Sequence, residues 1–322
     1  MRFLIAIGRA LLGLAGLATF GLSVLALAAP MHWLLALVGA WDRLVLVIGF
    51  LGLLALWIAR WKVLAVLQGM AVLALLFLNL RVPTELVATR HEAVSPAASQ
   101  RLVWANVHDN RAALRALASL PEVRAAGVIG LGEVPGESDL AALFPSVTPV
   151  GPAQPRSATW GVETLGCRII PAPELSIRPG RHFGLKAACP GFVLIVLHLQ
   201  NPTRGRGEGL RQRDLELQAL TQAVAQIEGP VVVMGDFNTT PSALPLYHML
   251  QETGLKRVAC GGAVAGTWRP IRWARTVMDD IPGLKVTIDH LLVRHVEVAA
   301  CSVGPDIGSD HFPLIVTLGQ SG

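Results

Sequence analysis

Three apolar runs within the first 80 residues constrain the fold of this 322-residue chain more than any other feature. Ala10 to Ala29 contains no charged residue, and Leu44 to Ala59 and Val63 to Leu80 are similarly apolar. The second run alternatively belongs to a longer, tilted helix that begins near Met31. Because a helix needs about 20 apolar residues to cross the ~30 Å hydrocarbon core of a bilayer, we predict three transmembrane helices within residues 1–81.

The charges beside these runs predict the orientation in the membrane. Up to position 80 the chain has five basic residues and one acidic residue, so this region carries +4 of the net charge of +5. Arg2 and Arg9 lie at the start of the region, and Arg60 and Lys62 lie between the last two runs. By the positive-inside rule these positions face the cytoplasm. Three crossings then place the rest of the chain outside the cytoplasm.

The part of the chain beyond the apolar runs is almost neutral, so its charge gives no evidence for a nucleic-acid-binding surface. We predict a linker over residues 82–100 and one domain over residues 101–322. No spacing of cysteine and histidine in this domain indicates a zinc site, so two disulfides and four free thiols both remain open. An oxidising compartment permits pairing of Cys167 with Cys189 and of Cys260 with Cys301.

Short apolar runs in the domain alternate with amphipathic segments, and this rhythm predicts two packed sheets with helices outside them. The predicted helices are Arg111 to Leu120 and Arg211 to Ile227. The predicted strands are Leu102 to Val107, Gly127 to Leu131, Trp160 to Ile170, Phe192 to His198, Val231 to Met234, Val286 to Val293 and Leu314 to Leu318.

Polar groups with catalytic potential follow or adjoin several of these strands. The sequence VVVMGDFNTTP, residues 231–241, delivers Asp236 and Asn238 to the tip of a buried strand. In α/β enzymes ligands gather at the carboxyl ends of strands, where loops present polar groups from a rigid base. The other strand-end candidates are Asn106, Glu133, His198, Asp289, Asp310 and His311.

The ordered motifs WANV, GLGEV, LHL, GDFN, TIDHLLV and SDHFPL resemble the endonuclease/exonuclease/phosphatase superfamily, which has the DNase I-like fold. The resemblance covers roughly Leu102 to Leu318. It implies an α+β domain, a four-layer α/β sandwich of two packed β-sheets flanked by helices, with a metal-dependent phosphoesterase activity. The three membrane helices before such a domain are similar to those of membrane-anchored bacterial members. Together with the orientation above, the resemblance implies a bacterial inner membrane with the domain on its periplasmic side.

The resemblance also implies roles for individual residues. Glu133 matches the metal-binding glutamate, and Asn106 and Asp310 match positions that support the metal. These oxygen and amide groups suit Mg²⁺, with Mn²⁺ as an alternative. Asp236 matches the aspartate that activates water or manages the leaving-group proton, and Asn238 matches the amide that holds the nucleophile or a phosphate oxygen.

Two histidines complete the catalytic set that the resemblance implies. His311 with Asp289 matches a pair in which the carboxylate orients the imidazole and favours its charged form. His198 matches a second histidine that contacts the phosphate. Arg211, Arg213 and Trp268 are candidates for substrate phosphate and base contacts, against the alternatives of a solvated basic face and core packing.

The substrate stays open at this level. Several nucleases of the superfamily carry a tyrosine at the phosphate, whereas the only tyrosine here, Tyr247, lies outside the corresponding motif. A nucleic acid, a lipid headgroup and a small molecule are all candidate phosphoesters, and the bilayer is the one further partner indicated, with no protein partner. A non-catalytic receptor or scaffold is the rival class, and a broken set of metal and His-Asp residues would be its signature.

Overall fold

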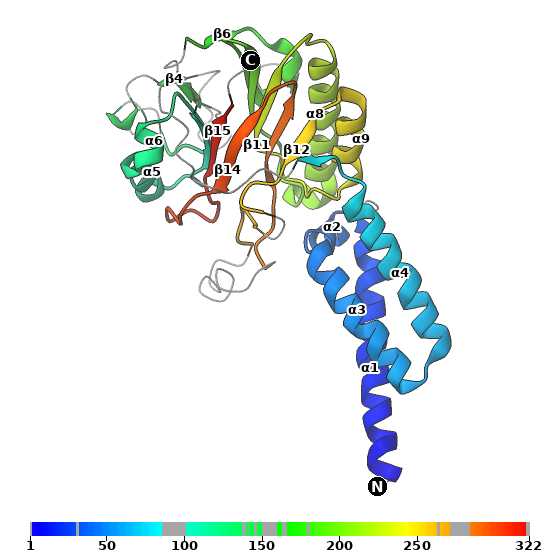
Figure 1. The fold of residues 1–322 in the computed structure, drawn as a ribbon. Coiled ribbons are helices and arrows are strands. Elements are labelled where there is room, and N and C mark those ends of the chain that lie inside the picture. Colours follow the sequence, from blue (N-terminus) through cyan, green and yellow to red (C-terminus); the bar gives the residue numbers. More distant parts are fainter. Residues whose placement is uncertain are drawn as a thin grey trace.

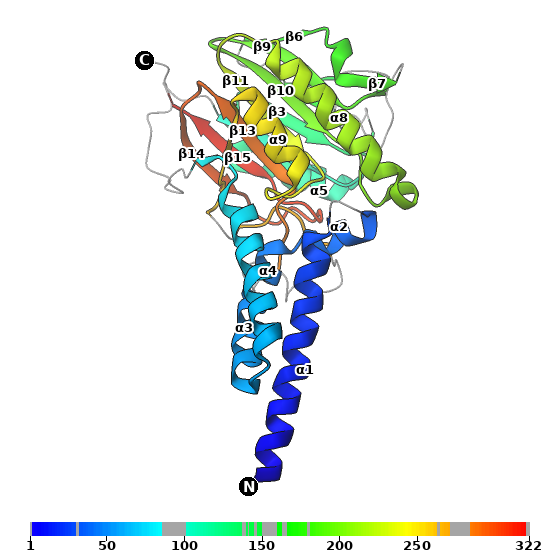
Figure 2. The same cartoon turned by 90° about the vertical axis from the view of Figure 1, so that its right-hand side faces the viewer.

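The computed structural model describes residues 2–29, 32–85, 101–136, 140, 142–144, 147–149, 160–162, 166–178, 181–262, 265–270 and 284–319. A helical bundle at the N-terminal end joins a domain built on two sheets (Figure 1). A view turned by 90° shows the bundle helices reaching the domain below the sheets (Figure 2). The chain therefore has an elongated apolar part and a compact mixed part.

The bundle consists of α1 (Arg2–Leu27), α2 (Trp33–Gly39), α3 (Asp42–Ala59) and α4 (Lys62–Leu80). By length and composition, α1 from Phe3 onward, α3 and α4 could each cross a membrane. α2 is a short helix separated from α3 by a turn at Ala40 and Trp41. The alternative of one long helix from Met31 is therefore not formed, and α1 begins well before the predicted start at Ala10.

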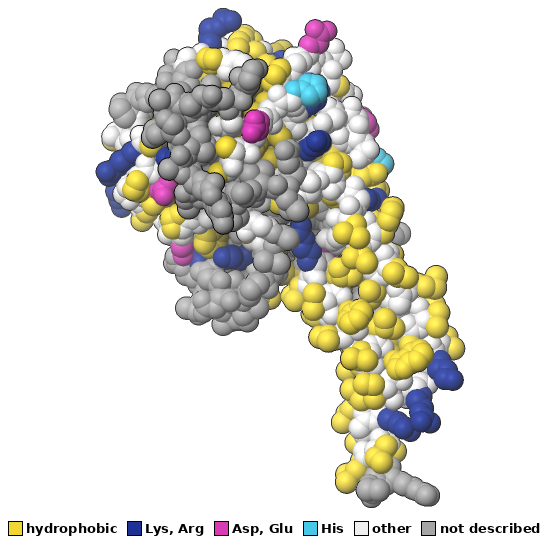
Figure 3. Space-filling view, viewed as in Figure 1, with side chains coloured by type: hydrophobic (Ala, Val, Ile, Leu, Met, Phe, Trp, Pro, Cys, Tyr) yellow, Lys and Arg dark blue, Asp and Glu magenta, His cyan; other side chains and the backbone are white. Residues whose placement is uncertain are grey.

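The outer surface of the bundle is covered by hydrophobic side chains (Figure 3). Phe50, Trp57, Phe77 and Leu80 are 61%, 69%, 65% and 73% exposed. Exposed apolar surface on this scale marks a membrane or partner contact rather than a water-facing surface. The three long helices thus match the predicted membrane spans in both length and surface.

Small residues hold the bundle together. A Cβ atom on Gly52 of α3 would lie 1.8 Å from Oγ1 of Thr19 in α1, so the two helices approach as closely as a glycine allows. The buried Gln68 of α4 donates through Nε2 to the carbonyl oxygen of Gly49 at 2.8 Å and to Oγ of Ser23 at 3.2 Å. Close backbone approach and buried polar contacts of this kind stabilise helix association in lipid.

Two mixed sheets form the domain. The seven-stranded sheet has the order β1-β12-β13-β11-β10-β9-β6, and the six-stranded sheet has the order β14-β15-β2-β3-β5-β4. The first contains β1 (Thr84–Glu85), β6 (Arg168–Ile170), β9 (Gly184–Cys189), β10 (Phe192–His198), β11 (Val231–Asp236), β12 (Lys256–Val258) and β13 (Asp289–Arg294). The second contains β2 (Arg101–Asn106), β3 (Val128–Gly132), β4 (Val147–Pro149), β5 (Trp160–Val162), β14 (Val298–Val303) and β15 (Leu314–Leu318). A separate ribbon pairs β7 (Ser176–Arg178) with β8 (Arg181–His182).

The sheets pack face to face through apolar side chains. Trp104, Val196, Met234 and Leu291 belong to this inner core, and a Cβ atom on Gly130 would lie 2.6 Å from the Val196 side chain. The glycine is thus needed for the close approach of the sheets. This inner layer brings the tips of strands from both sheets to one edge of the domain.

Helices cover the outer face of each sheet. A second apolar core lies between the seven-stranded sheet and the helices α8 (Glu208–Ala225) and α9 (Leu244–Thr253). A third lies between the six-stranded sheet and α5 (Arg111–Ser119) and α6 (Pro121–Arg124). The side chain of Asn110 caps α5 by accepting from the backbone N–H groups of Ala112 and Ala113. The predicted four-layer sandwich is confirmed.

Two disulfides link neighbouring segments. Cys167 pairs with Cys189, and Cys260 pairs with Cys301. Among the residues that the structure describes, no cysteine is free. These are the two cysteine pairs that the sequence analysis named for an oxidising compartment.

Several element boundaries differ from prediction. The strand expected from Trp160 to Ile170 is two strands in different sheets, because β5 pairs with β3 and β6 pairs with β9. The helix expected at Arg211 begins at Glu208, and the strand expected at Val286 begins at Asp289. The strands β9 and β12 and the helix α9 were not predicted, because none of these segments shows a strong hydrophobic period in the sequence.

The bundle and the domain are joined by more than the chain. Within the segment predicted as a linker, β1 pairs in parallel with β12, and Val82 is buried. Residues 86–100 of that segment lie outside the described residues. Trp41 donates through Nε1 to the carbonyl oxygen of Leu284 at 3.0 Å. The guanidinium group of Arg81 lies 4.3 Å from the ring centre of Tyr247, so the tyrosine packs at this junction.

Candidate active site

Parallel strand pairs place the site. β10 and β11 run in parallel with His198 opposite Asp236, and β2 and β3 run in parallel with Asn106 opposite Gly132, the residue before Glu133. Each pair sits inside its sheet, and the two sheets face each other. Four functional side chains from two sheets therefore meet at one edge, as expected for carboxyl ends of parallel strands.

Gly235 is needed for this geometry. Its φ is 154°, and a Cβ atom there would lie 2.0 Å from the carbonyl oxygen of Leu197 on the adjacent strand. A side chain at this position would push β11 away from β10. The glycine before Asp236 thus keeps that carboxylate beside His198.

Asn106 is the hydrogen-bond centre of the site. Its fully buried Nδ2 group donates to Oε1 of Glu133 at 3.1 Å and to Oδ2 of Asp236 at 3.2 Å. Its Oδ1 atom accepts from the backbone N–H of His108 at 2.9 Å, and its carbonyl oxygen accepts from Oγ of Ser309 at 2.8 Å. One amide therefore fixes carboxylates that come from both sheets.

Glu133 stands between two histidines. Nδ1 of His108 lies 3.4 Å from its Oε2 atom, and Nε2 of His198 lies 3.4 Å from its Oε1 atom. Burial raises the pKa of Glu133, but the hydrogen bond from His108 and the charge of His198 outweigh it and lower that pKa to about 2. The side chain is therefore a carboxylate at any physiological pH, ready to face a cation.

Asp236 has the opposite electrostatic environment. It is 1% exposed, and its Oδ1 atom accepts from the backbone N–H of Asn238 at 2.8 Å. Burial and the negative charge of Asp289 raise the pKa of Asp236 to about 6. A carboxylate with a pKa close to neutrality can exchange a proton with a reacting group.

His311 and Asp289 form a buried pair. Nδ1 of His311 lies 2.9 Å from Oδ2 of Asp289, and Oδ1 of the same carboxylate accepts from Nε1 of Trp104 at 2.8 Å. Burial lowers the pKa of His311, but the charge and hydrogen bond of Asp289 reverse this and raise it to about 10. The imidazole is therefore protonated at neutral pH, with Nε2 at 3.8 Å from Oδ2 of Asp236.

Of the remaining predicted residues, all but Arg211 line one cavity together with Glu133, Asp236 and His311. Asn238, Asp310 and Trp268 are among them, and Nε1 of Trp268 lies 3.4 Å from Oδ2 of Asp310. Arg213 also lines it, but its guanidinium group already contacts Asp214 and the carbonyl oxygen of Asn238 at 3.1 Å. Arg211 is exposed and is not among the described residues that line the cavity.

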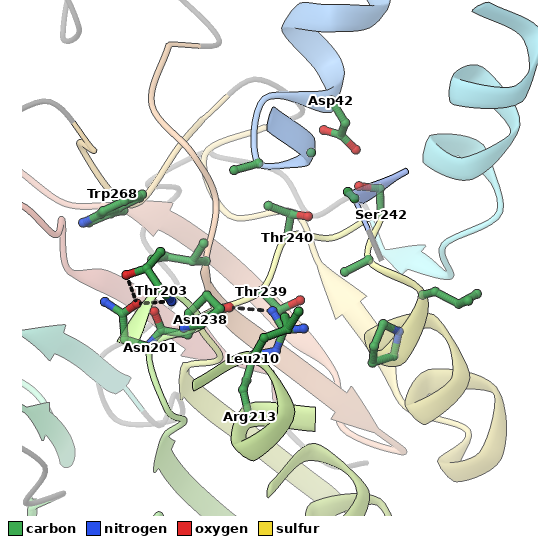
Figure 4. Close-up of a pocket in the computed structure, with 18 of the residues that line it drawn as sticks. Asp42, Asn201, Thr203, Leu210, Arg213, Asn238, Thr239, Thr240, Ser242 and Trp268 are labelled. Atoms are coloured by element: carbon green, nitrogen blue, oxygen red, sulfur yellow. Dashed lines mark hydrogen bonds between the residues drawn. The ribbon is translucent and has the colours of Figure 1, made fainter. Parts of the chain in front are cut away.

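The cavity has a volume of about 650 Å³, and we call it the site cavity. Figure 4 shows Asn238, Trp268 and Arg213 on the domain side and Asp42 on the bundle side. Glu133, Asp236 and His311 also line it, so the hydrogen-bonded cluster opens into this space. The site is therefore shared between the strand tips and the ends of the bundle helices α1 and α4.

The sequence profile of the endonuclease/exonuclease/phosphatase family matches residues 103–311, which is well over half of the chain. The chain belongs to this family. It is accordingly a metal-dependent phosphoester hydrolase, and its complete set of strand-end residues argues against the non-catalytic scaffold. A search of the curated proteins finds no significant match to the sequence.

Solved structures agree with the family at the level of the fold. An AP endonuclease from Leishmania major has a TM-score of 0.59 at 14% identity, over 76% of this chain and 95% of that one. An AP endonuclease from Archaeoglobus fulgidus has a TM-score of 0.53 at 13% identity, over 68% and 99%. A family protein from Bacteroides thetaiotaomicron has a TM-score of 0.52 at 15% identity, over 70% and 98%.

The residues of this family member fit a divalent metal. One ligand atom each from Glu133, His198 and Asp236 lies within 4.8 Å of the others, and Asp236, Asp289 and His311 form a second such group. The second group is closed by its own hydrogen bond and holds a charged imidazole, which makes it a poor cation site. The first group, with its ionised Glu133, is the better fit.

Some site residues were not found from the sequence. His108 bridges Glu133 and Asp310, with Nδ1 at 3.4 Å from each carboxylate. It follows Asn106 in a turn with φ of 49° rather than ending a strand, so the strand-end rule misses it. No sequence pattern marks Thr267 either, yet its Oγ1 atom accepts a hydrogen bond from the backbone N–H of Asp289 at 3.0 Å.

Proposed function

We propose that this hydrolase is a membrane-anchored, Mg²⁺-dependent phosphoesterase that cleaves a phosphodiester or phosphomonoester by attack of water, with Mn²⁺ as an alternative ion. The observation that carries the proposal is a hydrogen-bonded cluster of side chains. Asn106 holds the carboxylates of Glu133 and Asp236 together, and Nε2 of His311 lies 3.8 Å from Oδ2 of Asp236. The pKa shifts agree with this cluster, since the pKa of Glu133 is lowered to about 2, that of Asp236 is raised to about 6 and that of His311 is raised to about 10. A cation ligand, a proton acceptor and a positive donor are what in-line phosphoryl transfer requires.

Each group has a role in this proposal. Glu133 would hold the ion together with Asp236 or His198, and Asn106 and Asp310 would support it. When bound, the ion supplies positive charge against the phosphoryl oxygens. Asp236 accepts a proton from the attacking water while that oxygen bonds to phosphorus and the ester P–O bond breaks. The proton then passes to the leaving oxygen, so the reaction consumes one water.

The other residues hold the phosphate. His311, kept protonated and oriented by Asp289, donates from Nε2 to a phosphoryl oxygen and stabilises its developing charge. His198 lies 3.5 Å from Oδ2 of Asp236 on the neighbouring strand of the same sheet, and it contacts the phosphate from there. Asn238 lines the cavity beside them and is held by a 2.9 Å hydrogen bond from Nδ2 to the carbonyl oxygen of Leu199.

The same proposal includes a periplasmic location of the domain, with residues 1–81 as the membrane region. Arg9 lies near the start of α1, and Arg60 and Lys62 connect α3 to α4 at the end of the bundle remote from the domain (Figure 1). The positive-inside rule puts this end in the cytoplasm. Two disulfides in the domain support the oxidising side of the membrane.

The test uses the full-length protein in detergent, because β1 belongs to the sheet and would be lost from a shorter chain. We expect Mg²⁺-dependent release of nitrophenol from bis(4-nitrophenyl) phosphate or 4-nitrophenyl phosphate, and no release in excess EDTA. His311→Ala and Asp236→Ala abolish the rate, whereas His182→Ala, at an exposed histidine outside the cavity, does not. One common residual rate for wild type, all three variants and the EDTA sample would overturn the proposal.

A metal titration gives a second readout that does not depend on turnover. A ligand that binds the folded protein raises its melting temperature. We expect millimolar Mg²⁺ or Mn²⁺ to raise the melting temperature of the wild type and to have a smaller effect on Glu133→Gln. An equal response of the two proteins would remove Glu133 from the metal site.

A further inference from the structure

The site cavity is larger and more varied than a phosphate site needs. Its volume of about 650 Å³ lies within the ~300–1,000 Å³ that is typical of sites for whole small molecules. Glu133, Asp236 and His311 line one side, while residues of α1 and α4 line the other. A phosphoryl group at the polar side would leave the other side to the rest of the substrate.

That other side is built from the ends of membrane helices. We call Ala26, Leu27, Leu75 and Leu78, which all line the cavity, the apolar wall. Leu27 and Leu78 are partly exposed, whereas Ala26 and Leu75 are buried. Leu244 at the start of α9 continues the apolar surface on the domain side. A surface of this composition favours hydrocarbon and disfavours a charged or sugar-rich chain.

The position of the apolar wall along the helices matters as much as its composition. α1 ends at Leu27 and α4 ends at Leu80, where the predicted spans also end. At 1.5 Å per residue, Leu75 lies only about 8 Å below the end of α4. In a bilayer crossed by α1, α3 and α4, the apolar wall would sit at the level where lipid headgroups give way to acyl chains.

The polar residues between the two sides are already used to join the bundle to the domain. Asp42 accepts from the backbone N–H of Arg43 at 2.7 Å, and Arg81 packs on Tyr247 and points Nη2 at the carbonyl oxygen of Ser242. Arg213 is engaged by Asp214 and Asn238. Arg81 and Arg213 are the basic residues other than histidine among the described residues that line the cavity. Because both are already engaged, the cavity offers no row of positive charges that could follow a nucleic-acid backbone.

We propose that the substrate is an amphipathic phosphoester, a membrane lipid whose phosphate reaches Glu133, Asp236 and His311 while its hydrocarbon chain lies against the apolar wall. This inference rests on the proposed phosphoesterase function and assigns its substrate class. The membrane helices then form half of the substrate site in addition to anchoring the domain. Nucleic acid is the competing class, and it is an outcome of the test.

The test compares two chromogenic diesters, methyl 4-nitrophenyl phosphate and dodecyl 4-nitrophenyl phosphate, with the full-length protein in one detergent. Because a hydrocarbon chain that lies against the apolar wall is removed from water, we expect kcat/KM for the dodecyl ester to exceed that for the methyl ester by about tenfold or more. Leu78→Trp and Leu27→Trp fill the apolar wall from α4 and from α1. Each should reduce this ratio of kcat/KM values at least about threefold.

Leu80→Trp is the matched control, because it makes the same change on the same helix. Two positions differ by about 200° around a helix, so Leu80, 73% exposed, points away from Leu78. Leu80→Trp keeps the wild-type ratio, and melting temperatures near that of the wild type show that the variants are folded. Since partition of the esters into micelles is common to all proteins, differences among them report the cavity.

Every other outcome counts against the lipid assignment, and one of them also counts against the phosphoesterase function. Hydrolysis of both esters with equal kcat/KM, or equal loss of the ratio in Leu78→Trp and Leu80→Trp, overturns the lipid assignment and leaves the phosphoesterase function standing. No hydrolysis of either ester in Mg²⁺ or Mn²⁺ overturns the function as well. Faster cleavage of an oligonucleotide duplex with an abasic site, unaffected by Leu78→Trp, assigns the site to nucleic acid.

Discussion

The two sides of the site cavity are built on different physical principles. On the domain side, Asn106, Glu133 and Asp236 come from strand tips of two sheets and are held by specific hydrogen bonds. On the bundle side, Leu27 and Leu78 come from helix ends and are held by close helix packing. Hydrogen bonds fix direction and charge, whereas apolar packing fixes shape. Chemistry and substrate preference are therefore expected to be separable by mutation.

The largest effect should come from the domain side. Asp236→Asn keeps the size of the side chain but removes the proton acceptor, so we expect kcat to fall about 10³-fold. The apolar wall is untouched, so KM for dodecyl 4-nitrophenyl phosphate should change little. Steady-state kinetics with that ester separate the two parameters. A large rise in KM with little change in kcat would show that the two sides are not separable.

Asp289→Asn should have a smaller effect with a distinctive pH dependence. Asp289 raises the pKa of His311 to about 10, so the wild-type imidazole stays protonated as pH rises towards that value. Loss of the carboxylate returns the pKa towards its ordinary value near 6.5. We expect kcat to fall about tenfold to a hundredfold at pH 8 and to recover partly at pH 6.

A pH–rate profile of both proteins from pH 5.5 to 10 checks this expectation. The alkaline limb should move to lower pH in Asp289→Asn and stay in place in Leu80→Trp. A uniform drop across the whole range would indicate that Asp289 only supports the fold.

Disturbed packing between the bundle helices should lower the stability of the protein and weaken its ester preference. Gly52→Leu places a side chain where a Cβ already meets Thr19 at 1.8 Å, so α1 and α3 must separate. We expect a loss of about 1–3 kcal/mol in stability and a weaker preference for the dodecyl ester. Gly21→Leu on α1 is the control, because nothing lies within 4 Å of its Cβ position. Thermal unfolding and the ester ratio should distinguish the two, and equal behaviour would contradict the packing account.

The smallest expected effect concerns His290, which lies beneath the domain side. It is 1% exposed, its Nε2 lies 2.9 Å from the carbonyl oxygen of Thr239, and burial with the charge of Arg257 lowers its pKa to about 3. The unfolded chain takes up this proton near pH 6.5, so stability is full above that value and declines as pH falls towards 3.

His290→Gln removes this titration. Between pH 6.5 and 4 it should lose about 1–2 kcal/mol less stability than the wild type, as measured by chemical unfolding at several pH values. Parallel pH curves for the two proteins would show that acid sensitivity arises from the active-site cluster instead.

Much of the domain side could be predicted from the sequence. A buried strand followed by a polar residue can be recognised in the sequence, and the ends of parallel strands meet at one edge of a sheet. The sequence therefore predicts that Asn106, Glu133, His198 and Asp236 lie close together, as they do in the structure. His108 was not, because it sits in a left-handed turn with no period to mark it. The contact of Trp104 with Asp289 crosses between the two sheets, which no local pattern reveals.

The bundle side could be predicted only in part. Hydropathy identifies helices long enough to span a bilayer, but an apolar residue that faces lipid and one that faces a substrate cavity look alike in sequence. Leu78 and Leu80 illustrate this, since only their placement on opposite faces of α4 separates their roles. The short strand β1 was missed for a related reason, because two residues carry no periodicity.

That short strand has a consequence for kinetics. Arg81, Val82 and Pro83 alone separate the end of α4 from β1, which pairs with β12. In a protein anchored by these helices, as proposed, this connection would keep the active site at a constant height above the bilayer. An enzyme held in this way samples its own leaflet by lateral diffusion. Its rate on a lipid would follow the mole fraction of that lipid in the surface, and adding more vesicles of the same composition would leave the rate per enzyme unchanged.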